Sequence, residues 1–387
     1  MTDSLIYLDN NATTPMDPRV FEAIKPYFLE QFGNAASRHH RLGCQAAQAV
    51  ETARRQVADV IGADPREIIF TSGATESVNL AIQGAAASKA YARKSRHIVT
   101  AHTEHPAVLD TCRQLARNGF DITFLPVDSQ GCLDLDRLTR CVTDQTLLVS
   151  IMHANNEIGL IHPIAEVGRI CRERGVLFHT DATQSFGKEP LDVRAAHIDL
   201  LSLSAHKIYG PKGVGALYVR RAGPRVRCQA LIHGGGHERG LRSGTLNVPG
   251  IVGLGAAAKL CQQEMHAEQH RIRQRRDHLQ SALFSRIQGV VLNGHAQDRL
   301  ANTLNVSFDG VDGDDLMQAM PDVALSSSSA CTSAQLQPSH VLGAMGASDQ
   351  RMQQSVRISL GRFTTAEQIE HTIKSFESAV AQCRQSC

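Results

Sequence analysis

A lysine at the end of an apolar stretch is the residue whose surroundings point most directly to chemistry. Lys207 follows the apolar run 200–203 and precedes a glycine–proline turn at 210–211. This pattern predicts a strand that ends near the lysine, and α/β proteins bind their ligands at the carboxyl ends of strands. Ser204 and His206 can donate hydrogen bonds to an anion there. The combination favours a lysine that forms a Schiff base with an aldehyde cofactor over a solvated surface lysine.

Further residues occupy equivalent places along the chain, each just after a predicted strand. They are Ala74, His105, Asn156 and Asp181. Any one of them alone would more often be a turn former or a helix cap than part of a site, as Lys207 alone would be a surface residue. Their coincidence with Lys207 indicates a single site at the carboxyl edge of a parallel sheet.

Two of these stretches suggest what the site would hold. Residues 71–76 fall between a predicted strand and a predicted helix, where backbone N–H groups bind phosphate and Gly73 permits a close approach. Asp181 suits a pyridine nitrogen, because a carboxylate keeps that nitrogen protonated and makes the ring an electron sink. Together with an imine on Lys207, these features indicate an aldehyde cofactor built on a pyridine ring.

The composition is that of an ordinary soluble globular protein. The chain has 387 residues, 42% of them hydrophobic and 20% charged, enough for about two domains. Its formal net charge of +2 gives no case for nucleic acid or an anionic membrane as the main partner. No apolar run is long enough for a membrane span, and residues 1–5 lack the features of a signal peptide, so a cytoplasmic location is expected. The cysteines form no C-x-x-C pair, and no metal site is predicted.

The elements that must position these residues are short apolar runs separated by stretches of helical length. The predicted strands are 68–71, 98–100, 122–125, 147–152, 176–179, 200–203 and 216–219. Predicted helices between or before them include 45–61, 76–93, 107–118 and 164–174. Strands that alternate with helices predict an α/β fold: a mostly parallel seven-stranded sheet with helices on both faces.

The pattern changes near residue 256, which predicts a second and smaller domain. A long helix is expected over 251–287, strands over 302–308 and 355–359, and a last helix over 364–382 that begins with the capping-box pattern Thr364-x-x-Glu367. The opening run 5–9 is a further predicted strand. We expect a large α/β domain over 14–255 and a small α+β domain made of 1–13 with 256–387.

The motifs resemble those of cysteine desulfurases of the NifS/IscS type, in the class V aminotransferase-like family with the pyridoxal-phosphate (PLP) fold type I. The resemblance covers nearly the whole chain. It is carried by Ser204-Ala205-His206-Lys207-Ile208-Tyr209-Gly210-Pro211-Lys212-Gly213, by Gly234-Gly235-Gly236-His237-Glu238-Arg239-Gly240, by Arg242-Ser243-Gly244-Thr245 and by Ser329-Ala330-Cys331-Thr332-Ser333. It implies pyridoxal 5'-phosphate as the cofactor.

The resemblance also implies a role for each matched residue. Lys207 would form the Schiff base, His105 would stack on the ring and assist proton transfer, and Asp181 would pair with the pyridine nitrogen. Asn156 and Gln184 would contact the ring and its phenolic oxygen. The implied phosphate ligands are Ala74, Thr75, Ser204 and His206, joined by Thr245 from across a dimer interface. The implied substrate contacts are Arg357, which would clamp the carboxylate, with Asn11, Asn34 and Asn156.

Cys331 distinguishes a desulfurase from an ordinary aminotransferase. A random cysteine is more often a buried thiol, but Cys331 lies among small polar residues that are typical of an exposed loop. By resemblance its thiolate would attack the sulfur of L-cysteine, giving a persulfide and L-alanine. The family usually has glycine where this chain has Ser328 and proline where it has Ala35.

The implied assembly is a homodimer that passes sulfur to a transient acceptor or iron–sulfur scaffold protein, with no nucleic-acid or membrane partner. Two alternatives stay open. One is a selenocysteine lyase or another sulfur lyase on the same fold. The other is a catalytically silent scaffold or docking subunit, although the joint presence of Lys207 and Cys331 argues against it.

Overall fold

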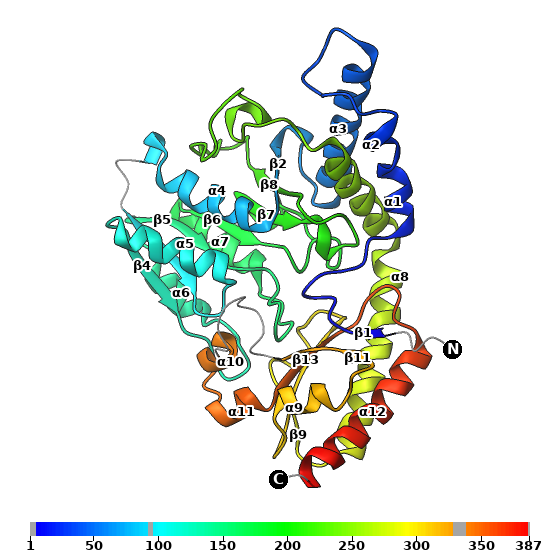
Figure 1. Cartoon of the computed structure of the whole chain (residues 1–387). Coiled ribbons are helices and arrows are strands. Elements are labelled where there is room, and N and C mark those ends of the chain that lie inside the picture. Colours follow the sequence, from blue (N-terminus) through cyan, green and yellow to red (C-terminus); the bar gives the residue numbers. More distant parts are fainter. Residues whose placement is uncertain (1–4, 92–95, 328–337, 386–387) are drawn as a thin grey trace.

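The structure is a computed structural model that describes residues 5–91, 96–327 and 338–385. Its centre is a seven-stranded sheet in the order β2-β8-β7-β6-β5-β3-β4, seen in the upper part of Figure 1. The strands are β2 (Ile68–Thr71), β3 (His97–Ala101), β4 (Asp121–Leu125), β5 (Thr146–Ser150), β6 (Leu177–Asp181), β7 (Leu200–Ser204) and β8 (Gly215–Val219). Within this sheet only β8 runs opposite to the other six strands. The predicted mostly parallel sheet of seven strands is confirmed.

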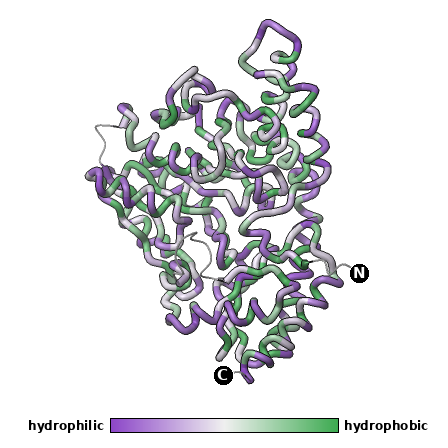
Figure 2. Tube along the Cα trace, in the orientation of Figure 1, coloured by the Kyte–Doolittle hydropathy of each residue, from purple (hydrophilic) through white to green (hydrophobic). Residues whose placement is uncertain are grey.

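Alternating side chains of each strand enter two different cores. Ile68 and Phe70 pack on one face of the sheet and Ile69 packs on the other. The first face is covered by α3 (Arg41–Val60), α7 (Ile164–Arg174) and the start of α8 (Val248–Arg286), and the second by α4 (Ala74–Ala86) and α5 (Pro106–Arg117). Helices therefore cover both faces, as predicted. Figure 2 shows the mixture of green and purple along these helices that is expected when only one side is buried.

The remaining elements of the first two thirds connect or flank this sheet, except for β1, which packs in a second core in the C-terminal part. They are β1 (Ile6–Tyr7), α1 (Pro18–Ile24), α2 (Pro26–Leu29), η1 (Pro65–Glu67), η2 (Lys89–Tyr91), α6 (Leu135–Cys141), η3 (Ala205–Lys207) and η4 (Glu238–Gly240). The predicted helix 76–93 is too long at its C-terminal end: α4 stops at Ala86 and a separate turn, η2, follows. Among the described residues, no helix combines the length and apolar composition that a membrane span requires.

A second core lies in the C-terminal part, at the bottom of Figure 1. A four-stranded antiparallel sheet has the order β12-β13-β10-β9, while β1 pairs in parallel with β11. The elements are β9 (Val290–Leu292), β10 (Thr303–Phe308), α9 (Gly313–Gln318), β11 (Val323–Ala324), β12 (Ser326–Ser327), α10 (His340–Ala344), α11 (Asp349–Gln353), β13 (Ser355–Ser359) and α12 (Ala366–Gln385). Ile6 and Leu8 join this core, and α8 contributes to both cores. The predicted domain boundaries stay a prediction.

The capping box of the last helix lies one residue later than predicted. The Thr365 hydroxyl accepts from the Gln368 N–H, and the Gln368 side chain accepts from the Thr365 N–H. The hydroxyl of Thr364 is engaged elsewhere, because it accepts a hydrogen bond from the N–H of Gly361. Two adjacent threonines fit the same pattern, and only the path of the preceding loop selects between them.

Candidate active site

One cavity of about 630 Å³ gathers most of the predicted site residues at the carboxyl ends of the central strands. Its lining includes Asn11, Ala74, Thr75, His105, Asn156, Asp181, Gln184, Ser204, His206, Lys207 and Arg357. These residues come from the loops after five strands of the large sheet, from the N-terminal segment and from β13. The polar residues that the sequence placed just after strands therefore do face one space.

Lys207 closes the short turn η3 directly after β7. Its Nζ donates to the backbone oxygens of Asn11 and Ala12, at 2.6 Å each. The Asn11 side chain in turn donates to the oxygen of Asn156 and to the hydroxyl of Thr303. The N-terminal segment thus lies against the lysine, although it is about 200 residues away in sequence. No local pattern predicts that contact.

His105 is the N-cap of α5, and its ring orientation follows from that role. Its Nδ1 accepts a hydrogen bond of 3.1 Å from the N–H of Ala107, so the proton of a neutral ring lies on Nε2. Burial lowers the pKa of His105, and the carboxylate of Asp181 opposes this only in part. A neutral, fixed imidazole at the cavity wall suits stacking on an aromatic ring.

Asp181 ends β6 with one carboxylate oxygen fixed. Its Oδ1 accepts from the N–H of Thr183 at 2.9 Å and from the hydroxyl of the same residue. Two residues earlier, the fully buried His179 lies between the hydroxyls of Ser150 and Ser202, at 2.8 and 3.0 Å. Burial lowers the pKa of His179 to about 4, so it is neutral at pH 7. The carboxylate is therefore oriented by its own turn, and the uncharged His179 network lies two residues before it in the same strand.

The start of α4 also lines the cavity. Its N-cap, Gly73, has no side chain to occupy the first N–H groups of this 13-residue helix. Ser204, His206 and Lys212 also line this space. Burial and the adjacent Lys207 lower the pKa of His206 to about 4, so its ring acts as a neutral hydrogen-bonding group. A helix N-terminus with such side chains matches the requirements of a phosphate group.

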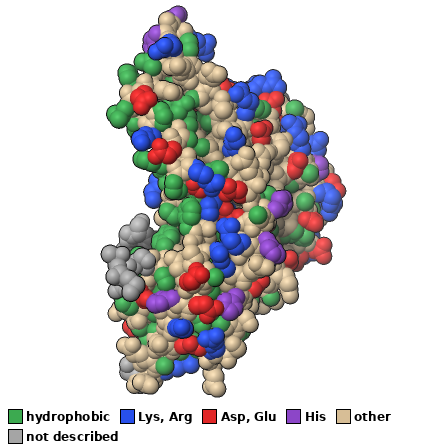
Figure 3. Space-filling view, turned by 90° about the vertical axis from the view of Figure 1, so that its right-hand side faces the viewer, with side chains coloured by type: hydrophobic (Ala, Val, Ile, Leu, Met, Phe, Trp, Pro, Cys, Tyr) green, Lys and Arg blue, Asp and Glu red, His purple; other side chains and the backbone are tan. Residues whose placement is uncertain are grey.

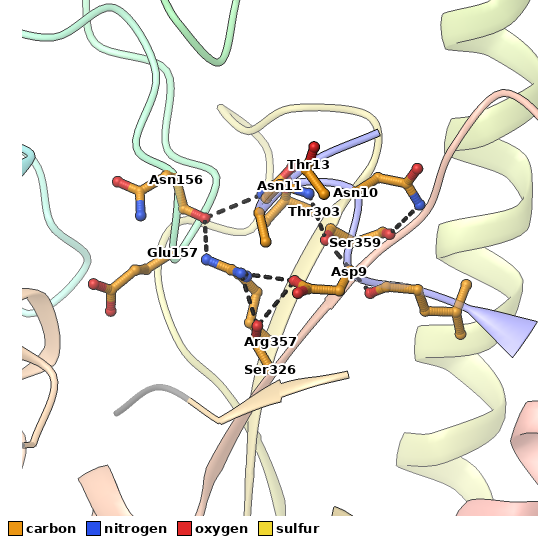
Figure 4. A network of polar contacts seen from close by, with 12 residues as sticks. Asp9, Asn10, Asn11, Thr13, Asn156, Glu157, Thr303, Ser326, Arg357 and Ser359 are labelled. Atoms are coloured by element: carbon orange, nitrogen blue, oxygen red, sulfur yellow. Dashed lines mark hydrogen bonds and ion pairs between the residues drawn. The ribbon is translucent and has the colours of Figure 1, made fainter. Parts of the chain in front are cut away.

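Arg357 projects from β13 toward the turn that carries Asn156. Its Nη2 donates to Asp9 at 2.7 Å and to the Ser326 hydroxyl at 2.9 Å, and its Nη1 donates to the oxygen of Asn156 at 3.2 Å (Figure 4). These contacts hold the guanidinium at the cavity edge. A fixed, planar set of donors is the arrangement that a carboxylate requires.

Three predicted site residues are not among the lining of this cavity. Thr245 is exposed, and Asn34 is exposed with its Oδ1 accepting from the N–H of Ala36. Cys331 lies outside the described residues. The cavity also includes Thr183 and Lys212, which sequence reasoning missed. Lys212 belongs to the quoted motif 204–213, and Thr183 lies between the predicted residues Asp181 and Gln184, so their positions were the available signal.

Comparisons with known proteins agree with this geometry. The sequence matches the family described as Aminotransferase class-V over residues 6–372. The cysteine desulfurase IscS of Cronobacter sakazakii is 54% identical over 381 residues, which cover 98% of this chain and 93% of that protein. The cysteine desulfurase IscS of Escherichia coli O139:H28 matches to the same extent.

Solved structures agree as well. A NifS-like protein has a TM-score of 0.90 and 39% sequence identity, covering 98% of this chain and 100% of that one. A NifS-like protein from Rickettsia africae has a TM-score of 0.86 and 31% identity, covering 97% of this chain and 99% of that one. The fold, the arrangement of the cavity and the sequence match all lead to one assignment: this chain belongs to the aminotransferase class-V family.

Proposed function

We propose that this protein is a PLP-dependent cysteine desulfurase that converts L-cysteine to L-alanine and leaves the sulfur as a persulfide on Cys331. The observation that carries the proposal is the convergence of Lys207, His105 and Asp181 on one cavity. It is supported by relatives that are named cysteine desulfurase and cover nearly the whole chain.

The residues present fit pyridoxal 5'-phosphate. Asp181 offers a carboxylate for the pyridine nitrogen, the uncapped start of α4 with Ser204 and His206 offers donors for the phosphate, and Lys207 offers the amine. Asn156 and Gln184 would contact the ring and its phenolic oxygen, and Thr245 would reach the phosphate of a second subunit. When bound, the cofactor supplies an electron sink for the carbanion formed at Cα of the substrate.

The chain's own groups would bind the substrate and move its protons. Arg357 would bind the carboxylate of L-cysteine, with Asn11, Asn34 and Asn156 shaping the pocket around it. The Nζ of Lys207, which is held at the carbonyls of Asn11 and Ala12, would carry the proton from Cα. His105 would assist proton transfer through Nε2.

The sulfur transfer would be completed by Cys331. Its thiolate attacks the substrate sulfur, a bond forms between the two sulfurs, and the bond between substrate sulfur and Cβ breaks with its electron pair moving toward Cβ. Protonation there releases L-alanine. Cys331 follows Ser326 by five residues, so the two can be separated by at most about 18 Å. Ser326 contacts Arg357 of the cavity, and this contact supports the proposed role of Cys331.

The proposed assembly is a homodimer. Large hydrophobic side chains are exposed on and after α1 and α2, namely Phe21, Phe28, Leu29 and Phe32. Figure 3 shows hydrophobic side chains gathered in the upper part of the face that carries these helices. A second copy of the chain would cover such a surface and bring in Thr245. A transient sulfur acceptor or iron–sulfur scaffold protein would then take the persulfide sulfur.

The test is product analysis with the purified, cofactor-loaded protein. L-cysteine should give L-alanine, with one sulfur retained on the protein in the first turnover. Turnover of L-selenocysteine with little or none of L-cysteine would favour the selenocysteine lyase alternative. The absence of alanine from either substrate would leave only the silent scaffold.

A further inference from the structure

A lysine outside the cavity contacts one of the predicted cofactor ligands. Lys188 lies four residues after Gln184, and its Nζ donates to Gln184 Oε1 at 3.3 Å. Gln184 is buried, and its Nε2 donates to the backbone oxygen of Asn11 at 2.8 Å. Gln184 lines the cavity, whereas Lys188 lines a second, smaller pocket. Lys188 is therefore connected to the cavity only indirectly, by its hydrogen bond to the Gln184 amide.

The two contacts of this amide require the same orientation. A protonated lysine can only donate and a backbone oxygen can only accept, so the glutamine must present its oxygen to Lys188 and its NH₂ group to Asn11. Rotating the amide by half a turn would place two donors together on one side and two acceptors on the other. One hydrogen of the NH₂ group bonds Asn11, and the second remains for a group in the cavity.

The surroundings of Lys188 affect whether its amine is protonated. Within the part of the chain that the structure describes, Lys188 forms no ion pair, although Glu189 and Glu268 lie close enough to influence it, as does Cys261. Burial lowers the pKa of Lys188 to about 8, so the ammonium is still protonated at pH 7. The same charge lowers the pKa of His206, another residue of the cavity.

We infer that Lys188 is a positioning residue: it fixes the amide of Gln184 so that a hydrogen-bond donor, rather than an acceptor, faces the phenolic oxygen of the cofactor. The inference rests on the proposed function, because it takes Gln184 as a ligand of pyridoxal 5'-phosphate. An ammonium on the amide oxygen also polarises the amide and strengthens its N–H as a donor to a negatively charged oxygen.

A double-mutant cycle tests this inference. Lys188→Met, Gln184→Ala and the double variant are prepared as apo-protein, and the dissociation constant of pyridoxal 5'-phosphate is measured by equilibrium dialysis. Lys188→Met should weaken cofactor binding about 5- to 20-fold alone, but less than 2-fold in the Gln184→Ala background, since coupled residues are not additive. It should also raise the midpoint of the pH titration of the bound cofactor's absorption band, and Lys188→Arg should restore much of both properties.

Glu189→Gln is the matched control, because it changes the neighbouring half-buried carboxyl group, whose pKa burial raises to about 7, and no hydrogen bond joins that group to Gln184 among the described residues. An equal loss of affinity from Lys188→Met in both backgrounds, or no change in either property, overturns the inference. Two other variants replace Lys188→Met if circular dichroism shows that it does not fold. A Lys188→Arg variant whose cofactor band has an unshifted pH midpoint supports the inference. A Lys188→Gln variant with the wild-type dissociation constant and midpoint contradicts it. Failure of the wild-type protein to bind the cofactor would instead defeat the proposed function.

Discussion

The hydroxyl of Ser339 donates a hydrogen bond of 2.5 Å to the buried carboxylate of Glu157. The next residue, His340, places its Nε2 at 2.9 Å from the backbone oxygen of Glu104. Glu157 follows Asn156 and Glu104 precedes His105, so both contacts are made by neighbours of cavity residues. The chain that follows Cys331 is thus attached to the two turns that carry Asn156 and His105.

This attachment predicts a selective effect of Ser339→Ala. Cys331 precedes Ser339 by eight residues, so loosening the attachment should lower the rate of sulfur transfer to Cys331 about tenfold, while cofactor binding is retained. The expected factor corresponds to the loss of one buried hydrogen bond, about 1.5 kcal/mol. The rate is measured as persulfide formation in a single turnover.

Ser348→Ala is the control for Ser339→Ala. Ser339 caps α10 through the N–H of Leu342, and Ser348 caps α11 in the same way through the N–H of Arg351. Ser348 therefore loses only a helix cap when replaced, and persulfide formation should stay at the wild-type rate. Equal rates in the two variants would show that Ser339 acts only as a cap.

Arg357→Lys should weaken substrate binding more than turnover. A single ammonium cannot keep the contacts to Asp9, Ser326 and Asn156 while also pairing with a carboxylate. We expect KM for L-cysteine to rise about 10- to 100-fold, the loss of a charge-assisted hydrogen bond, with a smaller change in kcat. The control is Arg351→Lys, in α11 and outside the cavity, which should leave KM unchanged. If KM is also unchanged in Arg357→Lys, Arg357 does not bind the substrate carboxylate.

The buried histidines predict a stability that falls in mild acid. Burial lowers the pKa of His162 to about 4, against about 6.5 in an unfolded chain. The unfolded state then binds more protons between these values, so the free energy of unfolding decreases as the pH falls from 6.5 toward 4. Urea unfolding at pH 7 and pH 5 measures the change, which is about 2 kcal/mol for one such group over this interval.

Two variants distinguish the effect of histidine protonation on stability from the effect of losing side-chain contacts. Both ring nitrogens of His162 are without hydrogen-bond partners among the described residues, so His162→Leu should flatten the pH dependence at little cost at pH 7. His179→Leu should destabilise the protein at pH 7, because it removes the partner of the Ser150 and Ser202 hydroxyls. Parallel pH profiles of wild type and His162→Leu would contradict the assignment.

The sheet was predictable because its strands are short, continuous apolar runs bounded by polar turns. Each of the seven runs, such as 68–71 and 200–203, became a strand of the central sheet. The position of β8 between β2 and β7 was not predictable, since pairing depends on contacts between residues far apart in the chain. The end of α4 and the cap of α12 differ because tertiary contacts, which local patterns do not contain, set helix boundaries.

The site residues also differ in whether the sequence alone could predict them. Lys207, Asp181, Ala74, His105 and Asn156 were predictable from their positions after strands, whereas Gln184, Asn11 and Arg357 came from the family resemblance. The contacts of Lys207 with Asn11 and Ala12 and of Ser339 with Glu157 join segments far apart in the chain, which no local pattern encodes. Lys188 and Gln184 are only four residues apart, but they lie outside a regular helix, so no periodic pattern predicted their contact. The sequence therefore predicted the residues that would react or bind, while the residues that orient them could be identified only from the structure.

The central claim is that sulfur from L-cysteine is transferred to Cys331. The most direct measurement is the mass of the peptide that contains Cys331, after one turnover of the cofactor-loaded protein with L-cysteine and rapid alkylation. The account predicts one additional sulfur on Cys331, and no sulfur release to an acceptor in Cys331→Ala although the cofactor remains bound. Sulfur found on another cysteine, or normal sulfur release by Cys331→Ala, would contradict it.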